Sequence, residues 1–208
     1  MSARDAILAR LRTAGANTRL PRATAPAPAI PPVVAREAQL VRFRDEIEAL
    51  GVSCAIETTA AAVRERVRDL VRAETVLCWD DDQLPYGVAE VLAEPVRGSA
   101  PRDRQAAATV GVTGCDGAIA ETGSLVMLSR PGRSCAASLL PPFHIAIVRP
   151  DQFYATMGEF FAARESDVLG GASCTFITGP SRTADIELTL TLGIHGPGRV
   201  DIVIGPDV

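Results

Sequence analysis

Lysine is missing from this 208-residue sequence: every one of its 21 basic residues is an arginine. A Schiff base or general base supplied by lysine is therefore excluded within this chain. Acidic residues outnumber basic ones and give a formal net charge of −4, which disfavours a nucleic-acid-binding surface. No apolar run approaches the roughly 20 residues of a membrane span, and the start of the chain lacks the apolar core of a signal peptide. We therefore expect a cytoplasmic protein with no membrane span.

Cysteine is scarce and scattered. The five cysteines stand far apart, with no Cys-x-x-Cys pair, at positions 54, 78, 115, 135 and 174. An odd number of scattered cysteines in a cytoplasmic chain argues against a disulfide framework. Iron–sulfur clusters need closely spaced thiolates, so we expect none held by this chain. Cys54, Cys78 and Cys174 lie in apolar runs and are expected to be small core residues. The dinucleotide fingerprint Gly-x-Gly-x-x-Gly is also absent, so any redox chemistry would need a partner or a cofactor that the sequence does not reveal.

Prolines mark the boundary of an N-terminal arm. Residues 3–14 have helical spacing, with Ser2 as the cap and Gly15 as the stop. Residues 21–34 hold five prolines among alanines, which is typical of a stiff, extended linker. We therefore divide the chain into residues 1–34, an N-terminal helix and Pro/Ala-rich linker, and residues 35–208, an α/β domain.

Apolar spacing in the domain alternates between helix and strand periods. Helices are expected at residues 35–50, after Thr58, and at residues 81–93, 116–121 and 152–163. Strands are expected at residues 52–56, 75–79, 109–113, 124–129, 144–148, 175–178 and 199–204. Residues 185–194 alternate as a strand does, yet the hydroxyls before them could start a helix; we favour a helical turn near residues 182–187 that runs into extended chain. This alternation predicts a mainly parallel α/β sheet.

Two glycine-framed polar segments follow predicted strands, and ligands of open α/β sheets bind at the carboxyl ends of strands. In the first segment we assign Glu121 as a catalytic acid/base or nucleophile. The ligand-binding residues predicted around it are Gly114, Asp116, Thr122 and Gly123. The alternative is that Glu121 is a solvated helix end and Gly123 only the C-terminal stop.

The second segment, residues 179–197, carries hydroxyls, an arginine and a histidine. Ser181, Arg182 and Thr183 form a plausible anion cradle or, alternatively, a plain helix cap; Arg182 could instead anchor a carboxylate inside the fold. Asp185 is assigned to ligand binding; a metal site that it would share with Glu187 and His195 is disfavoured, because the spacing matches no ligand signature.

His195 is the candidate proton carrier, since its unperturbed pKa lies near 6.5, or it fixes the turn through a backbone bond. His144, which opens a strand, is expected to be structural. Arg130 and Arg133 lie in a polar loop that could receive an acidic ligand or could simply be solvated. We predict that residues 111–124, 179–187 and 193–197 converge in one crevice.

Four words in the sequence resemble the LUD domain family, as found in lactate-utilisation protein C. The words are Ala-Glu-Thr-Gly-Ser at 120–124, Leu-Leu-Pro-Pro-Phe-His at 139–144, Gly-Pro-Ser-Arg-Thr-Ala-Asp-Ile-Glu at 179–187 and Gly-Ile-His-Gly-Pro at 193–197. The resemblance spans roughly residues 36 to 205. It implies a three-layer sandwich around a mainly parallel sheet, similar to the ribose-phosphate isomerase/CoA-transferase-like fold. It also implies oxidation of L-lactate to pyruvate beside iron–sulfur partner subunits, and it supplies no catalytic residue set.

The sequence therefore leaves three functional hypotheses. The first is a subunit of an L-lactate utilisation system that binds a small acid or cofactor at strand-end loops, with iron–sulfur clusters only in its partner subunits. The second is a CoA-transferase-like or sugar-phosphate isomerase-like enzyme that uses Glu121. The third is a non-catalytic assembly subunit. In the first, the expected partners are those iron–sulfur subunits and a small anionic metabolite.

Overall fold

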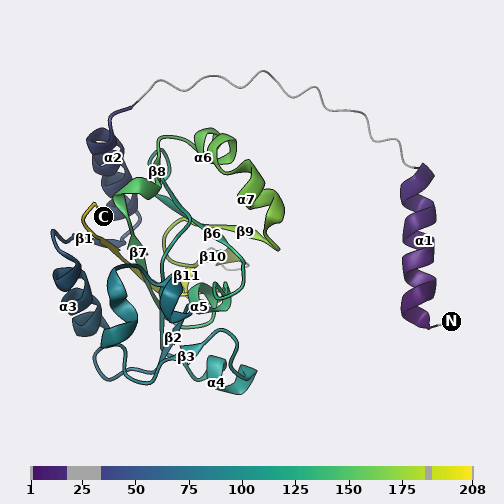
Figure 1. Cartoon of the computed structure of the whole chain (residues 1–208), viewed down its shortest axis with the longest axis horizontal. Coiled ribbons are helices and arrows are strands. Elements are labelled where there is room, and N and C mark those ends of the chain that lie inside the picture. Colours follow the sequence, from purple (N-terminus) through teal and green to yellow (C-terminus); the bar gives the residue numbers. More distant parts are fainter. Residues whose placement is uncertain (1, 18–33, 186–188, 208) are drawn as a thin grey trace. The chain divides into compact units, whose positions relative to one another are not determined.

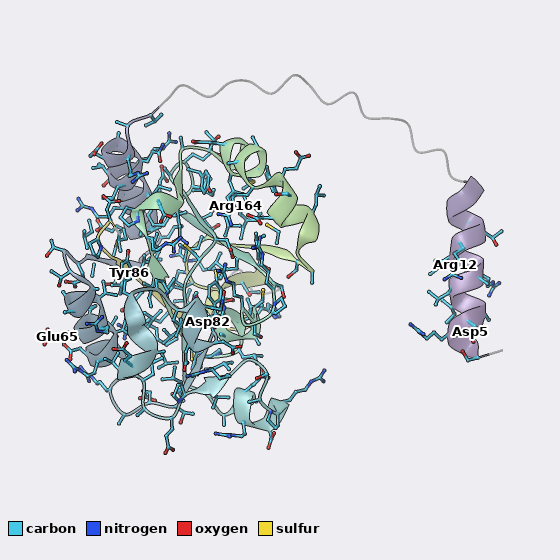
Figure 2. The ribbon with its side chains drawn as sticks, viewed as in Figure 1. Asp5, Arg12, Glu65, Asp82, Tyr86 and Arg164 are labelled. Atoms are coloured by element: carbon cyan, nitrogen blue, oxygen red, sulfur yellow. The ribbon has the colours of Figure 1, made fainter. Side chains whose placement is uncertain are left out.

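A computed structural model describes residues 2–17, 34–185 and 189–207, in two compact units that span residues 1–30 and 31–208. The described part of the first unit is α1 (Ala3–Asn17). The Ser2 hydroxyl accepts the Asp5 N–H at 3.2 Å, which confirms the predicted cap. The helix continues two residues past Gly15, the predicted stop, and Asp5 and Arg12 both project from it (Figure 2). Most of the proline-rich stretch lies outside the described residues.

Six parallel strands form the central sheet of the second unit (Figure 1). Their order across the sheet is β1 (Ser53–Ile56), β12 (Arg199–Ile204), β7 (Phe143–Val148), β4 (Val110–Thr113), β2 (Val76–Cys78) and β3 (Val96–Arg97). β2, β4, β7 and β12 are buried along almost their whole length, as parallel strands covered on both faces must be. The expected mixed α/β fold with a mainly parallel central sheet is confirmed.

Helices cover the sheet where the sequence supplies an apolar stripe or leaves room for close approach. Val63, Val67 and Val71 form the buried stripe of α3 (Ala60–Val71), whose cap is Thr59 rather than the predicted Thr58. At Gly111 a β-carbon would collide with the Ala137 carbonyl oxygen, so glycine lets α5 (Ala136–Leu139) sit directly on β4. The other helical elements that accompany this sheet are α2 (Arg36–Ala49), α4 (Arg102–Ala106), η1 (Asp81–Gln83) and η2 (Pro85–Val91).

A second, smaller sheet carries its own apolar cluster. Its order is β8 (Phe153–Tyr154), β5 (Gly117–Ile119), β6 (Ser124–Leu128) and β9 (Cys174–Ile177). Ile119, Val126 and Phe160 are fully buried together, and the Phe160 ring meets Tyr154 edge-to-face at 5.2 Å. Phe160 belongs to α6 (Met157–Ala163), and Figure 1 shows α6 and α7 (Glu165–Gly170) beside this sheet. A short 3₁₀ segment, η3 (Pro150–Gln152), precedes β8.

Three predicted helices differ from the structure. Residues 116–121 hold β5 instead, because residues 117–119 pair with β6 across a turn at Gly123, and that long-range pairing outweighs the weak local helix signal. Residues 81–93 contain the 3₁₀ segments η1 and η2 instead of one helix. Within η2 the chain is kinked at Tyr86 and Gly87, which have positive φ angles. The helix expected at 152–163 begins only at Met157, after η3 and β8.

The helical turn expected near residues 182–187 is also wrong. β10 (Arg182–Asp185) pairs antiparallel with β11 (Thr189–Leu192) as a separate two-stranded sheet. The strict apolar alternation that continues to residue 194 therefore carried the better signal. Residues 186–188, which include Glu187, lie outside the described residues.

Candidate functional site: an arginine-lined cavity at the strand ends

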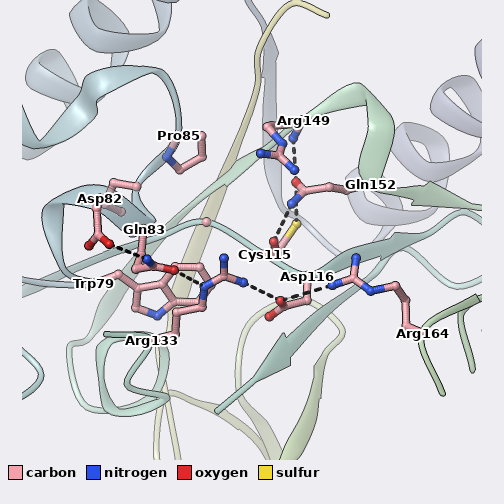
Figure 3. A pocket seen from close by; sticks show the side chains of 12 residues that line it. Trp79, Asp82, Gln83, Pro85, Cys115, Asp116, Arg133, Arg149, Gln152 and Arg164 are labelled. Atoms are coloured by element: carbon pink, nitrogen blue, oxygen red, sulfur yellow. Dashed lines mark hydrogen bonds and ion pairs between the residues drawn. The ribbon is translucent and has the colours of Figure 1, made fainter. Parts of the chain in front are cut away.

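A polar cavity of about 270 Å³ opens at the carboxyl ends of β2, β4 and β7 (Figure 3). The loops that leave these strands supply most of its wall, as is usual for open parallel sheets. The lining residues are Trp79, Asp82, Gln83, Leu84, Pro85, Gly114, Cys115, Asp116, Arg133, Arg149, Gln152 and Arg164. Three of them are arginines and two are aspartates, so the lining carries a formal charge of +1 (3 − 2).

Asp116 organises the cavity from below. Its side chain is fully buried between β4 and β5, and one carboxylate oxygen accepts the Leu128 N–H at 2.8 Å. The other oxygen accepts Nη1 of Arg133 at 2.6 Å and lies 4.0 Å from Nη2 of Arg164. A buried carboxylate is tolerated because these partners satisfy it. Asp116 thereby fixes two cationic side chains on one wall.

Arg133 is held on three sides. Besides Asp116, its Nε donates to the Gln83 Oε1 at 2.7 Å, and its guanidinium lies 5.3 Å from the centre of the Trp79 ring. The amide of Gln83 in turn donates to Asp82 at 2.8 Å. Figure 3 shows this chain of bonds running from Asp82 to Asp116. A guanidinium fixed in this way needs little further ordering when it meets an anion.

Arg164 reaches the cavity from the junction of α6 and α7, and Figure 3 shows it on the other side of Asp116 from Arg133. Its Nε donates to Asp167 at 2.5 Å, and Asp167 also pairs with Arg130 at 2.8 Å. The hydrogen bond from Arg164, followed by the one from Arg130, lowers the pKa of Asp167. The second sheet therefore contributes two cations to the site, Arg164 from the α6–α7 junction and Arg133 from the loop after β6.

The opposite wall is built by the segment that follows β7. Arg149 pairs with Asp151 through Nε at 3.0 Å and Nη2 at 3.2 Å. Gln152 accepts the Arg149 N–H at 2.9 Å and donates to the Cys115 carbonyl at 2.6 Å, which ties this segment to the loop after β4. Burial raises the pKa of the Cys115 thiol well above its usual range, so this cysteine is a neutral side chain rather than a nucleophile.

The chemistry of the lining suits binding more than proton transfer. Among the described residues that line the cavity there is no histidine, and the thiol is not a thiolate near neutral pH. Several guanidinium groups facing a small polar space are what a carboxylate or phosphate needs for bidentate hydrogen bonds. The site can therefore capture and orient a small anion.

Gly114 and Asp116, two of the predicted ligand-binding residues, line this cavity, as does Arg133 of the polar loop. A β-carbon at Gly114 would lie 3.1 Å from the Trp79 ring, so glycine lets this loop lie against the indole. Sequence reasoning missed Arg149 and Trp79, although Trp79 ends one predicted strand and Arg149 directly follows another, so the strand-end rule could have found them. Arg164 carried no such signal, because it comes from a helix junction of the other sheet.

Glu121, Thr122 and Gly123 lie outside the cavity lining. The Glu121 carboxylate accepts the Met157 N–H at 2.8 Å, at the first residue of α6, where a negative charge is favourable. The Thr122 hydroxyl bonds that of Ser124 at 2.8 Å, and Ser124 bonds Thr178 at 2.7 Å. This chain of hydroxyls joins the first glycine-framed segment to the second.

Both segments pack on the carboxyl end of α2. Gly123 and Gly179 have φ angles of 64° and 76°, and β-carbons there would press on Ile47 and Leu50 respectively. Arg182 donates to the Leu50 carbonyl oxygen just past the end of α2. Gly123, Gly179 and Arg182 therefore form a contact surface with the carboxyl end of α2, which we call the seam. A ligand role for Arg182 or Gly123 stays a prediction.

The remaining predicted residues lie on or beside the β10–β11 hairpin. The Ser181 N–H donates to the Pro197 carbonyl at 2.8 Å, and its hydroxyl accepts the His195 N–H at 3.3 Å. Thr183 and Asp185 pair with strand β11. Ser181 of the predicted segment 179–187 therefore meets residues 193–197, yet none of these residues lines the arginine cavity. A crevice shared by Glu121 and Ser181 stays a prediction.

His144 is buried in the central sheet. Its Nε2 bonds the Thr113 hydroxyl at 2.9 Å, its Nδ1 has no partner among the described residues, and burial lowers its pKa to about 4. Within the described ranges, no helix is long and apolar enough to cross a membrane. No group of three or more described histidine, cysteine or acidic side chains is placed to hold a metal ion.

Taken together, a parallel central sheet covered by helices, with a polar cavity at its strand ends, defines an α/β protein. A family model described as the LUD domain matches residues 40–204, so the chain belongs to the LUD domain family, which confirms the resemblance.

Similar proteins agree with this assignment. "Lactate utilization protein C" of Deinococcus radiodurans is 32% identical over 188 residues, which cover 88% of this chain and 87% of that protein. The protein of the same name from Shouchella clausii is 36% identical over 152 residues, 67% and 66% of the two chains. A crystal structure of a DUF162 family protein from Deinococcus radiodurans matches with a TM-score of 0.66 at 24% identity, over 83% of this chain and 99% of that one. This structural match shows the fold.

Proposed function

We propose that this chain is a ligand-binding component of a lactate-utilisation system and that its arginine-lined cavity holds a small organic anion. Two lines of support meet here. The similar proteins named above carry the printed name lactate utilization protein C. Independently, the cavity presents cationic donors in a space that fits a small carboxylate.

The observation that carries the proposal is the buried pairing of Asp116 with Arg133 and the approach of Arg164 to the same carboxylate. One negative charge fixes two guanidinium groups, and Arg164 is paired in addition with Asp167. Arg149 on the opposite wall adds a third guanidinium, which is paired with the exposed Asp151. A small carboxylate would accept hydrogen bonds from these guanidinium groups, which line the cavity on both walls.

We also propose that electron transfer in such a system takes place in other subunits that hold iron–sulfur clusters. The thiols of this chain support that division. Burial raises the pKa of Cys54 and of Cys78 to about 11, which opposes the thiolate form that cluster ligation needs. Purified chain incubated with iron and sulfide under reducing conditions should acquire no cluster absorption, whereas uptake of a cluster would contradict this division.

The alternative of an enzyme that uses Glu121 has less support. The Glu121 carboxylate already accepts a backbone N–H at the start of α6, and the residue does not line the arginine cavity. A carboxylate that caps a helix contributes to the fold in that position.

Calorimetric titration of the purified chain with L-lactate and pyruvate tests the proposal. Arg149→Gln is the informative variant, because Arg149 pairs with the exposed Asp151 and its loss strands no buried charge. We expect its affinity for the bound acid to fall by roughly 1.5–3 kcal/mol, the range for charge-assisted hydrogen bonds. Arg66→Gln, which removes an arginine paired with Glu57 away from the cavity, is the matched control and should bind normally. Unchanged binding in Arg149→Gln would reject this cavity as the site.

A further inference from the structure

Asp82 is the one lining carboxylate that the cavity's own arginines do not neutralise. It lies just after β2, its side chain faces solvent at the rim, and its hydrogen bond comes from the neutral amide of Gln83. Asp116, in contrast, is buried and bonded directly to Arg133. The two aspartates therefore have different electrostatic roles.

We infer that Asp82 is a specificity-determining residue that makes the cavity reject dianions in favour of monoanions. The inference rests on the proposed function of the cavity. A bound carboxylate occupies N–H donors of the lining arginines, each of which already has a carboxylate partner in the protein. A second carboxylate on the same ligand then has no free cation and faces the negative charge of Asp82, so its desolvation is uncompensated.

Hydrogen bonding makes this charge separable from the geometry. Asp82 accepts from Gln83 Nε2, which leaves the Gln83 oxygen free to accept from Arg133. In Asp82→Asn the new amide oxygen can still accept the Gln83 donor. The substitution therefore removes the charge and keeps the chain of bonds that positions Arg133.

The test compares L-lactate with tartronate, which has a carboxylate where lactate has its methyl group. Binding is followed by the fluorescence of Trp79, the only tryptophan in the chain, and by calorimetry at low and high salt. We expect wild type to bind lactate at least roughly tenfold more tightly than tartronate, and Asp82→Asn to reduce that ratio by roughly three- to tenfold. The reduction should shrink as salt rises, because the Asp82 carboxylate is exposed.

Asp103→Asn is the matched control, since it makes the same change in net charge on α4 and does not line the cavity. Its lactate-to-tartronate ratio should equal that of wild type. An unchanged ratio in Asp82→Asn, or a ratio that changes equally in both variants, overturns the role of Asp82 while leaving anion binding intact. Failure of wild type to bind lactate, pyruvate or tartronate overturns the proposed function, and this inference with it.

Discussion

The arginine cavity and the glycine-framed seam on α2 differ in how far their residues can be recognised as motifs in the sequence. The segments at the seam contain the longest motifs of the family, yet their polar side chains bond the protein itself. Glu121 accepts a backbone N–H at the start of α6, and Arg182 donates to a carbonyl oxygen at the end of α2. The cavity is built from single residues that stand far apart in sequence, such as Trp79 and Arg164, and these face open space. A motif can be distinctive because its backbone must be shaped, whereas a binding site needs only that its side chains meet.

The largest loss of stability is expected in the arginine cavity, because its central carboxylate is buried. Arg133→Ala leaves the fully buried Asp116 without its closest partner, and we expect a loss of roughly 3–5 kcal/mol in the free energy of unfolding. Urea denaturation measures this loss. The double variant Arg133→Ala with Asp116→Asn should regain part of it, since no buried charge remains. A loss below about 1 kcal/mol would mean that the pair is not the anchor of the cavity.

The free energy of unfolding should depend on pH through His144, which is buried in the central sheet. The pKa of His144 is about 4 in the folded chain, against about 6.5 when unfolded. Above pH 6.5 the ring is neutral in both states and contributes no pH dependence. As the pH falls from 6.5 toward 4, the unfolded chain binds the proton first, so stability falls by up to about 1.4 kcal/mol per pH unit.

Denaturation curves at several pH values, compared between wild type and His144→Gln, isolate this contribution. The variant's overall stability can differ, but the slope assigned to His144 should vanish from it. An identical slope in both proteins would assign the pH dependence to other groups.

The seam should respond to loss of backbone freedom. At Gly123 the φ angle is 64°, and a β-carbon would lie 2.6 Å from Ile47 Cγ2. We expect Gly123→Ala to lower thermal stability by roughly 1–3 kcal/mol through strain and displacement of α2. Gly170→Ala, where a β-carbon meets nothing within 4 Å, is the control and should be close to neutral. Lactate affinity of folded Gly123→Ala should match wild type, and a large affinity loss would join the seam to the ligand site.

The smallest effect is expected at Arg182. Its exposed side chain donates to a carbonyl at the end of α2, an interaction worth roughly 0.3–1 kcal/mol. Arg182→Ala should therefore melt slightly earlier and bind small acids as wild type does. Reduced affinity with unchanged melting would restore the anion cradle first expected in this segment.

Much of the fold could be predicted because its strands are written in local sequence. The expected strands at 109–113 and 144–148 match β4 and β7 to within a residue, since continuous apolar runs are what doubly covered strands require. The errors fell where pairing partners are distant. Residues 117–119 become a strand only because β6 lies beside them, and a single sequence does not show that neighbour.

The site was predicted in part for the same reason. Gly114 and Asp116 follow β4 directly, so the strand-end rule found them. The loop that carries Arg133 was identified as one that could receive an anion. Arg164 could not be found, because its place depends on how the second sheet packs.

The sequence by itself determined the family, the parallel α/β class, the absence of lysine chemistry and the strand ends at which polar residues gather. These follow from residue identity and short-range period, which survive without a third dimension. Only the tertiary structure decided which polar residues face a cavity and which serve the fold. That choice depends on packing between distant segments: Asp116 draws Arg133 and Arg164 together because a buried charge must be compensated, and no local pattern records where its partners come from.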